Sequence, residues 1–378
     1  MKDEVLEEML PYLRESYGNP SAMYELAGTS KKALAKARQR AASVIGADPD
    51  EIFFTSGGTE SDNWALVGIA EAFRDKGRHI ITSSIEHPAI LQTCDYLDAR
   101  GFEITYLPVD SQGVVDPVAV ADAIRPDTIL VSVMAANNEV GTLEPIAEIG
   151  AVCKEKNVLF HTDAVQAFGQ IPLDVSKMHI DLLSASSHKI YGPKGTGLLY
   201  VAKGVPLRAL IHGGGQERSR RSGTENVAGI VGFGKACELA AKTLEERMKR
   251  ERRLRDFFIQ RATEAIPRCE LNGPAGDLRL PNNINLSLFC VEGESALILL
   301  DLRGIAASSG SACSTGSIDP SHVLVSMGQD ERKAHSSLRF TISDDTTMEE
   351  LEETLGALSD IAEQLRSMSA DWPAEISG

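Results

Sequence analysis

The strongest constraint on the fold is the alternation, between residues 52 and 201, of short apolar runs with longer amphipathic runs. The short runs have the length of buried strands, and the longer runs have the length and apolar spacing of helices. Strands that alternate with helices in this way form a mainly parallel sheet sandwiched between helices. The expected strands are 52–55, 79–82, 129–134, 158–161, 182–184 and 197–201; the expected helices are 3–15, 31–44, 60–73, 88–97 and 146–156.

A second, smaller domain is predicted to follow a long helical stretch, Thr224–Arg255. The elements beyond this stretch are shorter, with strands expected at 283–289 and 338–342 and helices at 293–302 and 347–368. We therefore divide the chain into a large α/β domain, residues 1–250, and a small α+β domain, residues 251–378. It stays open whether the first residues pack with the small domain.

Charge and cysteine spacing argue against several classes of protein. The 38 Lys and Arg against 54 Asp and Glu give a net charge of −16, which disfavours binding to nucleic acid or to an anionic membrane. The basic cluster Arg247–Arg255 is interpreted as the solvated face of a helix. Six scattered cysteines without a CxxC pair argue against a zinc knuckle.

No run approaches the roughly 18 apolar residues of a membrane helix, and the acidic N-terminus lacks a signal-peptide core. We therefore expect a cytoplasmic protein with free thiols.

Small and polar residues follow the first predicted strand, in the segment Thr55–Glu60. Small side chains such as Gly58 let backbone N–H groups at the start of the next helix approach an anion, and Thr59 adds a hydroxyl. A helix cap built on Thr59 explains this segment alone equally well. The segment is thus a candidate phosphate site.

Three further strand ends carry side chains suited to a flat, charged ligand. His87 can stack on a ring or satisfy a buried carbonyl, and Asn138 is also typical of a turn. Asp163, if buried, needs a cationic partner, and a protonated pyridine nitrogen is one such partner. A helix cap is the alternative for Asp163.

Lys189 lies in a polar segment, Ser184–Thr196, that follows an apolar run. Its amine must be neutral to form a Schiff base, and partial desolvation would lower the pKa of the amine accordingly. The nearby Ser186 hydroxyl and His188 imidazole are suited to holding a phosphate. A solvated lysine in a polar loop is the simpler interpretation of this segment by itself. Because such groups recur at successive strand ends, together they predict pyridoxal phosphate bound by a fold-type I enzyme.

The same segments resemble the cysteine desulfurases, and the similarity runs from about Val5 to the last helix. The resemblance implies an α/β fold-type I transferase with a mainly parallel seven-stranded sheet between helices and a smaller α+β C-terminal domain. The matching motifs are Thr-Ser-Gly-Gly-Thr-Glu-Ser-Asp-Asn (55–63), Glu-His-Pro-Ala (86–89), Ala-Asn-Asn-Glu-Val-Gly-Thr (136–142), Asp-Ala-Val-Gln (163–166), Ser-Ser-His-Lys-Ile-Tyr-Gly-Pro-Lys-Gly (186–195), Arg-Ser-Gly-Thr-Glu (221–225) and Ser-Ser-Gly-Ser-Ala-Cys-Ser-Thr-Gly-Ser (308–317).

The family implies a role for each matching residue. Lys189 forms the internal aldimine with pyridoxal phosphate and moves protons at the substrate α-carbon. Asp163 pairs with the pyridine nitrogen, and His87 stacks on the ring. The other implied contacts are Gln166 with the ring hydroxyl, Asn138 with cofactor and substrate, Gly58, Thr59, Ser186 and His188 with the phosphate, and Thr224 with the phosphate of the neighbouring subunit. This last contact implies a homodimer.

Two residues distinguish sulfur chemistry from amino-group transfer. Cys313 lies among Ser, Gly and Ala in what we interpret as a mobile, solvent-reachable loop. A thiolate there can attack the sulfur of a cofactor-bound cysteine and carry it away as a persulfide. A free surface thiol is the alternative without the family match. Arg339 is expected to hold the substrate carboxylate through a two-pronged pairing, although an arginine on a strand is more often a surface residue.

The resemblance therefore implies conversion of L-cysteine to L-alanine, with sulfur passed from Cys313 to an acceptor such as an iron–sulfur scaffold or a tRNA-thiolation enzyme. The loop that follows Cys313 is similar to the long-loop, nitrogen-fixation and housekeeping group. The alternatives are a selenocysteine lyase, an aminotransferase and a non-catalytic scaffold. The scaffold is considered because the chain begins after the strand with which the family normally opens, so we expect the cofactor to bind and turnover to be reduced.

Overall fold

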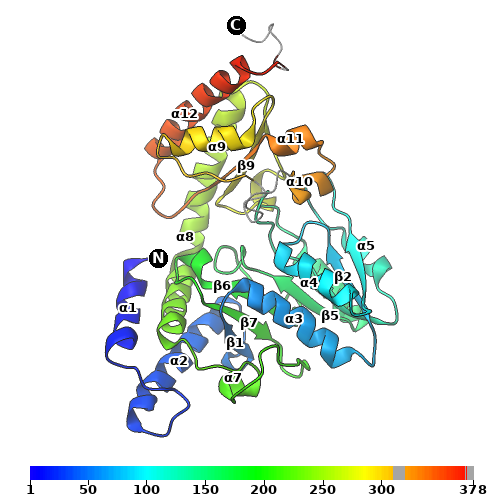
Figure 1. Ribbon diagram of the computed structural model, residues 1–378, viewed down its shortest axis with the longest axis vertical. Coiled ribbons are helices and arrows are strands. Elements are labelled where there is room, and N and C mark those ends of the chain that lie inside the picture. Colours follow the sequence, from blue (N-terminus) through cyan, green and yellow to red (C-terminus); the bar gives the residue numbers. More distant parts are fainter. Residues whose placement is uncertain (310–319, 371, 373–378) are drawn as a thin grey trace. The chain divides into compact units, whose positions relative to one another are not determined.

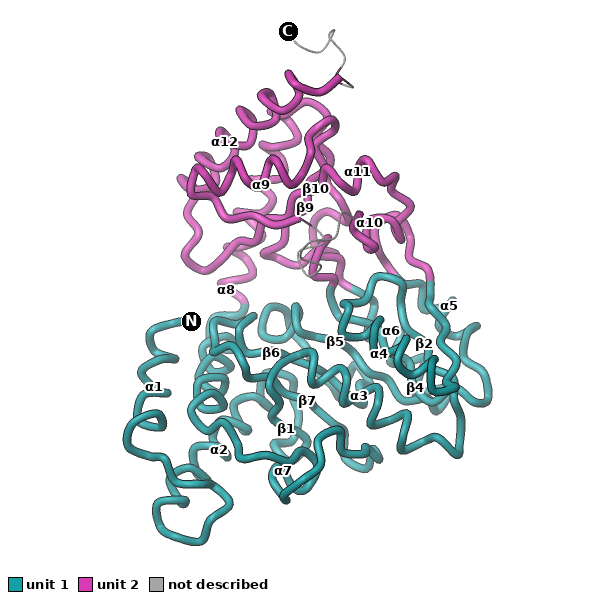
Figure 2. Tube along the Cα trace, viewed as in Figure 1, with its two compact units in different colours: residues 1–107, 115–136, 144–244 teal, residues 108–114, 137–143, 245–378 magenta. Residues whose placement is uncertain are grey.

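The computed structural model describes residues 1–309, 320–370 and 372, so Cys313 lies outside the described residues. The chain forms two compact units (Figure 2). The first unit comprises residues 1–107, 115–136 and 144–244, and the second comprises residues 108–114, 137–143 and 245–378. The sequence was divided once, at residue 250, whereas the units are discontinuous. Two short segments of the N-terminal half belong with the C-terminal residues.

The first unit is built on a seven-stranded sheet in the order β1-β7-β6-β5-β4-β2-β3 (Figure 1). The five strands from β6 to β3 are parallel, and β7 is antiparallel to both β1 and β6. The predicted α/β class and the seven-stranded sheet are therefore confirmed. The strands are β1 (Ile52–Thr55), β2 (His79–Ser83), β3 (Glu103–Leu107), β4 (Thr128–Ser132), β5 (Leu159–Asp163), β6 (Leu182–Ser186) and β7 (Gly197–Val201).

Helix α3 (Gly58–Phe73) packs on this sheet through an apolar stripe. Trp64 and Ile69 on the helix share one buried cluster with Ile80 of β2 and Leu199 of β7. The Trp64 ring meets Phe53 of β1 edge to face, with centroids 5.8 Å apart. The other helices of this unit are α1 (Asp3–Arg14), α2 (Glu25–Val44), α4 (Pro88–Asp98), α5 (Pro117–Ala123), α6 (Ile146–Lys156) and α7 (Gln216–Ser219).

The second unit has an antiparallel sheet in the order β10-β9-β8. Its core packs the strands against the C-terminal part of α8, α9 and α12. The elements are α8 (Val227–Ala265), which runs through the division between the units, β8 (Cys269–Leu271), β9 (Asn283–Leu288), α9 (Gly293–Asp301), α10 (His322–Ser326), α11 (Glu331–His335), β10 (Ser337–Thr341) and α12 (Met348–Ser367). Across the described ranges, no helix has both the length and the apolar character needed to cross a membrane.

Two expectations about the long helix were wrong. Helix α8 continues to Ala265 rather than stopping at Arg255, because Phe258 and Ala262 extend the buried face that begins at Leu254. The interpretation of the basic cluster as a solvated face is wrong for Arg247 and Arg255, which are 6% and 1% exposed, although Arg253 is exposed. The Arg255 guanidinium donates hydrogen bonds to the carbonyl oxygens of Arg279, Leu280 and Gly276, each at 3.0 Å. The buried Arg255 guanidinium is thus satisfied by these backbone carbonyls together with the Asp256 carboxylate, 2.8 Å away.

A buried ion pair fastens β1 to its surroundings in the first unit. The Arg38 guanidinium of α2 contacts both carboxylate oxygens of Glu217, at 2.7 and 2.9 Å. Glu217 Oε2 also accepts the Phe54 N–H of β1 at 3.0 Å. The Glu217 side chain is only 3% exposed, so the loss of its charge would leave Arg38 without its carboxylate partner.

We expect Glu217→Gln to lower the free energy of unfolding by about 3 kcal/mol, the usual cost of breaking a buried pair. Chemical denaturation followed by circular dichroism measures the change. The matched control is Glu103→Gln, which removes the carboxylate paired with Arg125 from a side chain that is 64% exposed. The control should leave the unfolding midpoint unchanged, and an equal loss in both variants would contradict a special role for the buried pair.

Candidate active site

Strand register gathers the predicted polar segments at one edge of the first unit's sheet. Thr55 at the end of β1 is paired with Gly197, and Gly197 is paired with Ser186 at the end of β6. On the next strand, Asp163 is paired with Ser184. Because β1, β5 and β6 all point the same way, the segments that follow them emerge together. A Cβ atom added at Gly197 would lie 2.6 Å from the Cα of Gly57, which is too close. The absence of a side chain at Gly197 therefore permits the close approach of the two segments.

The N-terminus of α3 opens into a cavity of about 400 Å³. The cap residue, Gly57, offers no side chain to the first helical N–H groups, which therefore remain able to bind an anion. A hydroxyl and an imidazole lie at the same cavity, since Ser186 Oγ is 2.9 Å from His188 Nδ1. The lining residues are Ser56, Gly57, Gly58, Thr59, Glu60, Ser186, His188, Lys194 and Gly195. All four residues predicted to hold a phosphate thus line one cavity.

Two features of this cavity were missed by sequence reasoning. Lys194 lines the wall and adds a positive charge; it lies within the family motif 186–195, but no role had been assigned to it. The Glu60 carboxylate would repel an anion, but the Arg221 guanidinium donates hydrogen bonds to its two oxygens at 2.8 and 3.1 Å. Although burial opposes ionisation, the Arg221 guanidinium and the Ser56 N–H keep the pKa of Glu60 below its usual range. Burial and the charges of Lys189 and Lys194 lower the pKa of His188.

Asp163 ends β5 with its side chain almost completely buried. Burial raises the pKa of its carboxyl to about 6, against the opposing effects of the Val165 N–H and the Lys189 charge. The Val165 N–H donates to Oδ1 at 2.8 Å. Among the residues that the structure describes, this N–H is the hydrogen-bond donor given for the buried carboxylate, so a bound cation would stabilise the carboxylate further. This is the setting predicted for a partner of a pyridinium nitrogen.

Lys189 lies in a short 3-10 turn, Ser187–Ile190, directly after β6. Its backbone carbonyl accepts the Gln170 amide at 2.9 Å, which fixes the turn. The residue is exposed, so the desolvation expected from the sequence is not seen at Lys189. Its charge nevertheless acts on Asp163, which places both groups in one electrostatic site.

The other predicted residues of the first unit have different settings. His87 caps α4, and its Nδ1 accepts the Ala89 N–H at 3.1 Å. A neutral His87 ring therefore carries its proton on Nε2. Gln166 is half-buried in the turn after β5. Thr224 is exposed in the loop before α8, outside the helix predicted to begin there.

The second unit brings Arg339 and Asn138 together. Arg339 Nη1 donates to the Asn138 carbonyl oxygen at 2.8 Å, and Nη2 donates to Ser308 Oγ at 3.3 Å. Backbone hydrogen bonds also join Arg339 to Ser308 in both directions. The half-buried guanidinium is thus held in a fixed orientation, with N–H groups remaining for a carboxylate.

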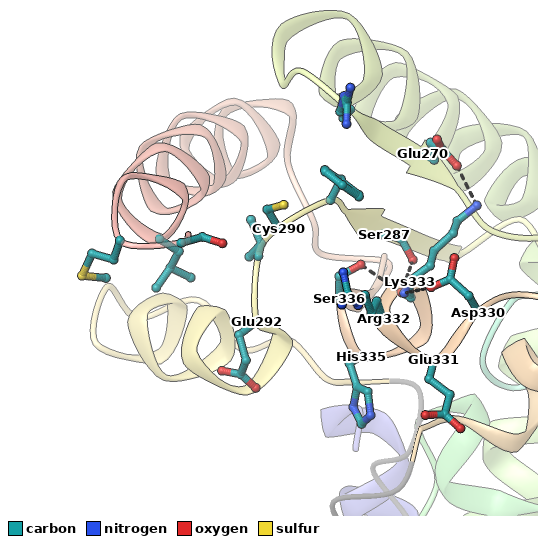
Figure 3. Close-up of a pocket in the computed structure, with 16 residues that line it drawn as sticks. Glu270, Ser287, Cys290, Glu292, Asp330, Glu331, Arg332, Lys333, His335 and Ser336 are labelled. Carbon is teal, nitrogen blue, oxygen red and sulfur yellow. Dashed lines mark hydrogen bonds and ion pairs between the residues drawn. The ribbon is translucent and has the colours of Figure 1, made fainter. Parts of the chain in front are cut away.

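A larger cavity of the second unit, about 1330 Å³, has a different character (Figure 3). Its wall includes Cys290, Lys333 and His335 but none of the residues predicted for the site. The Lys333 ammonium forms an ion pair with Glu270 at 2.6 Å. The cavity is therefore distinct from the predicted site in its lining residues.

Comparison with known proteins places this geometry in a family context. The class-V aminotransferase family matches residues 1–354. A Methanosarcina thermophila protein named cysteine desulfurase IscS is 53% identical over 375 residues, which cover 99% of this chain and 92% of that protein. A solved structure titled NifS-like protein has a TM-score of 0.90 and 42% identity, covering 96% of each chain. Another, titled SspA in complex with cysteine, has a TM-score of 0.78 and 38% identity, covering 90% of this chain and 95% of that one.

The buried Asp163 carboxyl should destabilise the protein when no cation is bound. Between pH 4 and about 6 the folded chain keeps a proton that the unfolded chain releases, so stability falls as pH rises to about 6 and then levels off. In protein without a bound ligand, Asp163→Asn should raise the free energy of unfolding at pH 8 by about 3 kcal/mol, the equivalent of the rise in the pKa of the Asp163 carboxyl to about 6. Denaturant titrations should show this gain shrinking below pH 6. A pH-independent difference would contradict the assignment.

Proposed function

Because the chain belongs to the cysteine desulfurases of the class-V aminotransferase family, we propose that it converts L-cysteine to L-alanine with pyridoxal phosphate and passes the sulfur to Cys313. The observation that carries this proposal is the anion cavity at the start of α3, which lies at the same sheet edge as Asp163 and Lys189. A phosphate site, a buried carboxylate and a lysine are the three attachments that this cofactor requires.

The residues of the first unit fit the cofactor. The cavity residues Thr59, Ser186 and His188 would hold the phosphate together with the N–H groups of α3. Asp163 would pair with the pyridine nitrogen, Gln166 with the ring hydroxyl, and Lys189 would hold the aldehyde carbon. When bound, pyridoxal phosphate supplies a conjugated ring that withdraws electrons from the substrate carbon atoms.

We assign proton transfer to Lys189 and ring stacking to His87. The Lys189 amine, once neutral, accepts and returns a proton at the substrate α-carbon. The His87 ring, which we propose stacks on the cofactor, would carry its proton on Nε2 because Nδ1 accepts the Ala89 N–H. The hydrogen bond from the Ala89 N–H fixes the orientation of the His87 ring, and with it the face of the ring that is available for stacking.

In the second unit, we propose that Arg339 binds the substrate carboxylate and that Asn138 orients the substrate. The hydrogen bonds of Arg339 to the Asn138 carbonyl and Ser308 restrict the guanidinium before substrate arrives, which lowers the entropy lost on binding. A lysine cannot reproduce the two parallel N–H donors of arginine.

Arg339→Lys should therefore raise the KM for L-cysteine at least about tenfold, the equivalent of about 1.4 kcal/mol, with a smaller effect on kcat. Steady-state measurement of alanine formation gives both constants. Arg332→Lys, at an exposed arginine in the wall of the larger cavity, is the matched control and should leave KM unchanged. An unchanged KM in Arg339→Lys would argue against carboxylate binding by this residue.

The sulfur step balances without an outside oxidant. The Cys313 thiolate attacks the substrate sulfur, a new S–S bond forms, and the substrate C–S bond breaks. The electron pair of the C–S bond stays with the substrate carbon, which takes up a proton to become the methyl group of alanine. The products are L-alanine and a Cys313 persulfide, which an acceptor thiol can collect.

The direct test combines colour, product and a cysteine exchange. Protein purified with pyridoxal phosphate should be yellow, and added L-cysteine should change the colour and release alanine. Cys313→Ala should reduce sulfide release with a thiol reductant at least about a hundredfold. Cys290→Ala, at a half-buried free thiol, should retain full activity. An aminotransferase would be indifferent to Cys313→Ala, and a colourless protein would rule out the cofactor chemistry.

Assembly and location extend the proposal. We propose that Thr224, exposed in the first unit, contacts the phosphate bound by a second copy, which makes the homodimer the functional unit. The sulfur acceptor would be an iron–sulfur scaffold or a tRNA-thiolation enzyme. Free thiols at five described cysteines suit the reducing cytoplasm.

A further inference from the structure

The first unit holds a second buried carboxyl that interacts electrostatically with Asp163 and that the proposed function does not use. Asp62 is in α3 and is 1% exposed. Its Oδ1 has no hydrogen-bond partner among the described residues. A buried oxygen without a partner is costly, and the cost is much larger for a charged carboxylate than for a neutral carboxyl. The charge state of Asp62 therefore needs an explanation.

His161 is the cationic partner that could keep Asp62 ionised, but its geometry argues against an ion pair. Its Nε2 is 3.8 Å from Asp62 Oδ1, which is too long for a hydrogen bond. Both ring nitrogens are instead engaged by hydroxyls, Nδ1 with Ser132 at 2.8 Å and Nε2 with Ser184 at 3.0 Å. Complete burial lowers the pKa of His161 to about 3, so the imidazole is neutral.

Two neighbouring carboxyls, Asp163 and Glu86, act on Asp62 electrostatically. Besides burial, the charges of Asp163 and Glu86 raise the pKa of Asp62 well above its usual range, while the Ser184 hydroxyl opposes them. Lys189 acts on Asp163, the other carboxyl of the pair. Two buried carboxyls that repel each other cannot both ionise readily, so one ionises and the other keeps its proton.

We propose that Asp62 holds a proton in the working enzyme and acts as a positioning residue for Asp163. Since Asp62 stays neutral, the negative charge of the pair is confined to Asp163, where the pyridine nitrogen would bind. This inference rests on the proposed function for the nature of the bound group, but the protonation of Asp62 can be measured without it.

Infrared spectroscopy tests the protonation directly. Protein labelled with ¹³C in its aspartate carboxyls is compared with unlabelled protein, and wild type is compared with Asp62→Asn, at neutral pH. We expect Asp62→Asn to remove one label-sensitive band of a protonated carboxyl. Loss of an ionised carboxylate band instead would overturn the proposal. If Asp62→Asn does not fold, Ser184→Ala serves, because loss of the Ser184 hydroxyl should shift the protonated band without removing it.

Cofactor binding tests the positioning role. An asparagine resembles a neutral carboxyl, so Asp62→Asn should keep the dissociation constant for pyridoxal phosphate within about twofold at pH 7, whereas Asp163→Asn should weaken it at least about tenfold. On raising the pH, ionisation of Asp62 should change the absorbance of the bound cofactor in wild type but not in Asp62→Asn. Equal weakening by both variants, or the same alkaline transition in both, would refute the role. If wild type binds no cofactor, the proposed function fails, and the infrared result still decides the state of Asp62.

Discussion

The burial of the Asp163 carboxyl is the physical constraint on which the first unit depends. A carboxylate in this position is destabilised by desolvation, and the described residues offset this with the hydrogen bond from the Val165 N–H and the charge of Lys189. A folded chain tolerates such a residue when a cationic ligand recovers the lost free energy. We therefore expect a bound cationic ligand to raise the free energy of unfolding of the first unit.

Sheet register explains how a site of this kind is assembled from distant segments. The pairing of Thr55 with Gly197 and of Gly197 with Ser186 brings the start of α3 beside the turn that carries Lys189. The Arg38–Glu217 pair supports the same strand, because Glu217 accepts the Phe54 N–H. Small changes in the strand pairing or in the Arg38–Glu217 pair would move the anion cavity relative to Lys189. Packing at a distance from the site therefore contributes to the geometry of the site.

Local sequence was sufficient for the features that depend on periodicity and motif, and insufficient for those that depend on tertiary partners. The alternation between Ile52 and Val201 predicted the sheet, but β3 was missed because most of its residues are at least partly exposed and give no apolar run. Arg255 was assigned to solvent because its burial depends on carbonyl groups about 20 residues later in the chain. The site residues followed from the family motifs. Lys194 and the Arg221–Glu60 pair became visible only when the cavity walls were known.

In the second unit, hydrogen bonds join residues that flank positions 310–319 to Arg339 and Glu139. Ser308, just before residues 310–319, is joined by backbone and side chain to Arg339. Ser321, just after them, donates its hydroxyl to Glu139, which burial holds at a pKa of about 7 against the effects of Ser321 and Arg339. Described residues on either side of positions 310–319 are therefore bonded to Arg339 and to Glu139, the neighbour of Asn138 in the sequence. If Arg339 binds the substrate carboxylate as proposed, the contacts of Ser308 that orient its guanidinium also contribute to substrate selection.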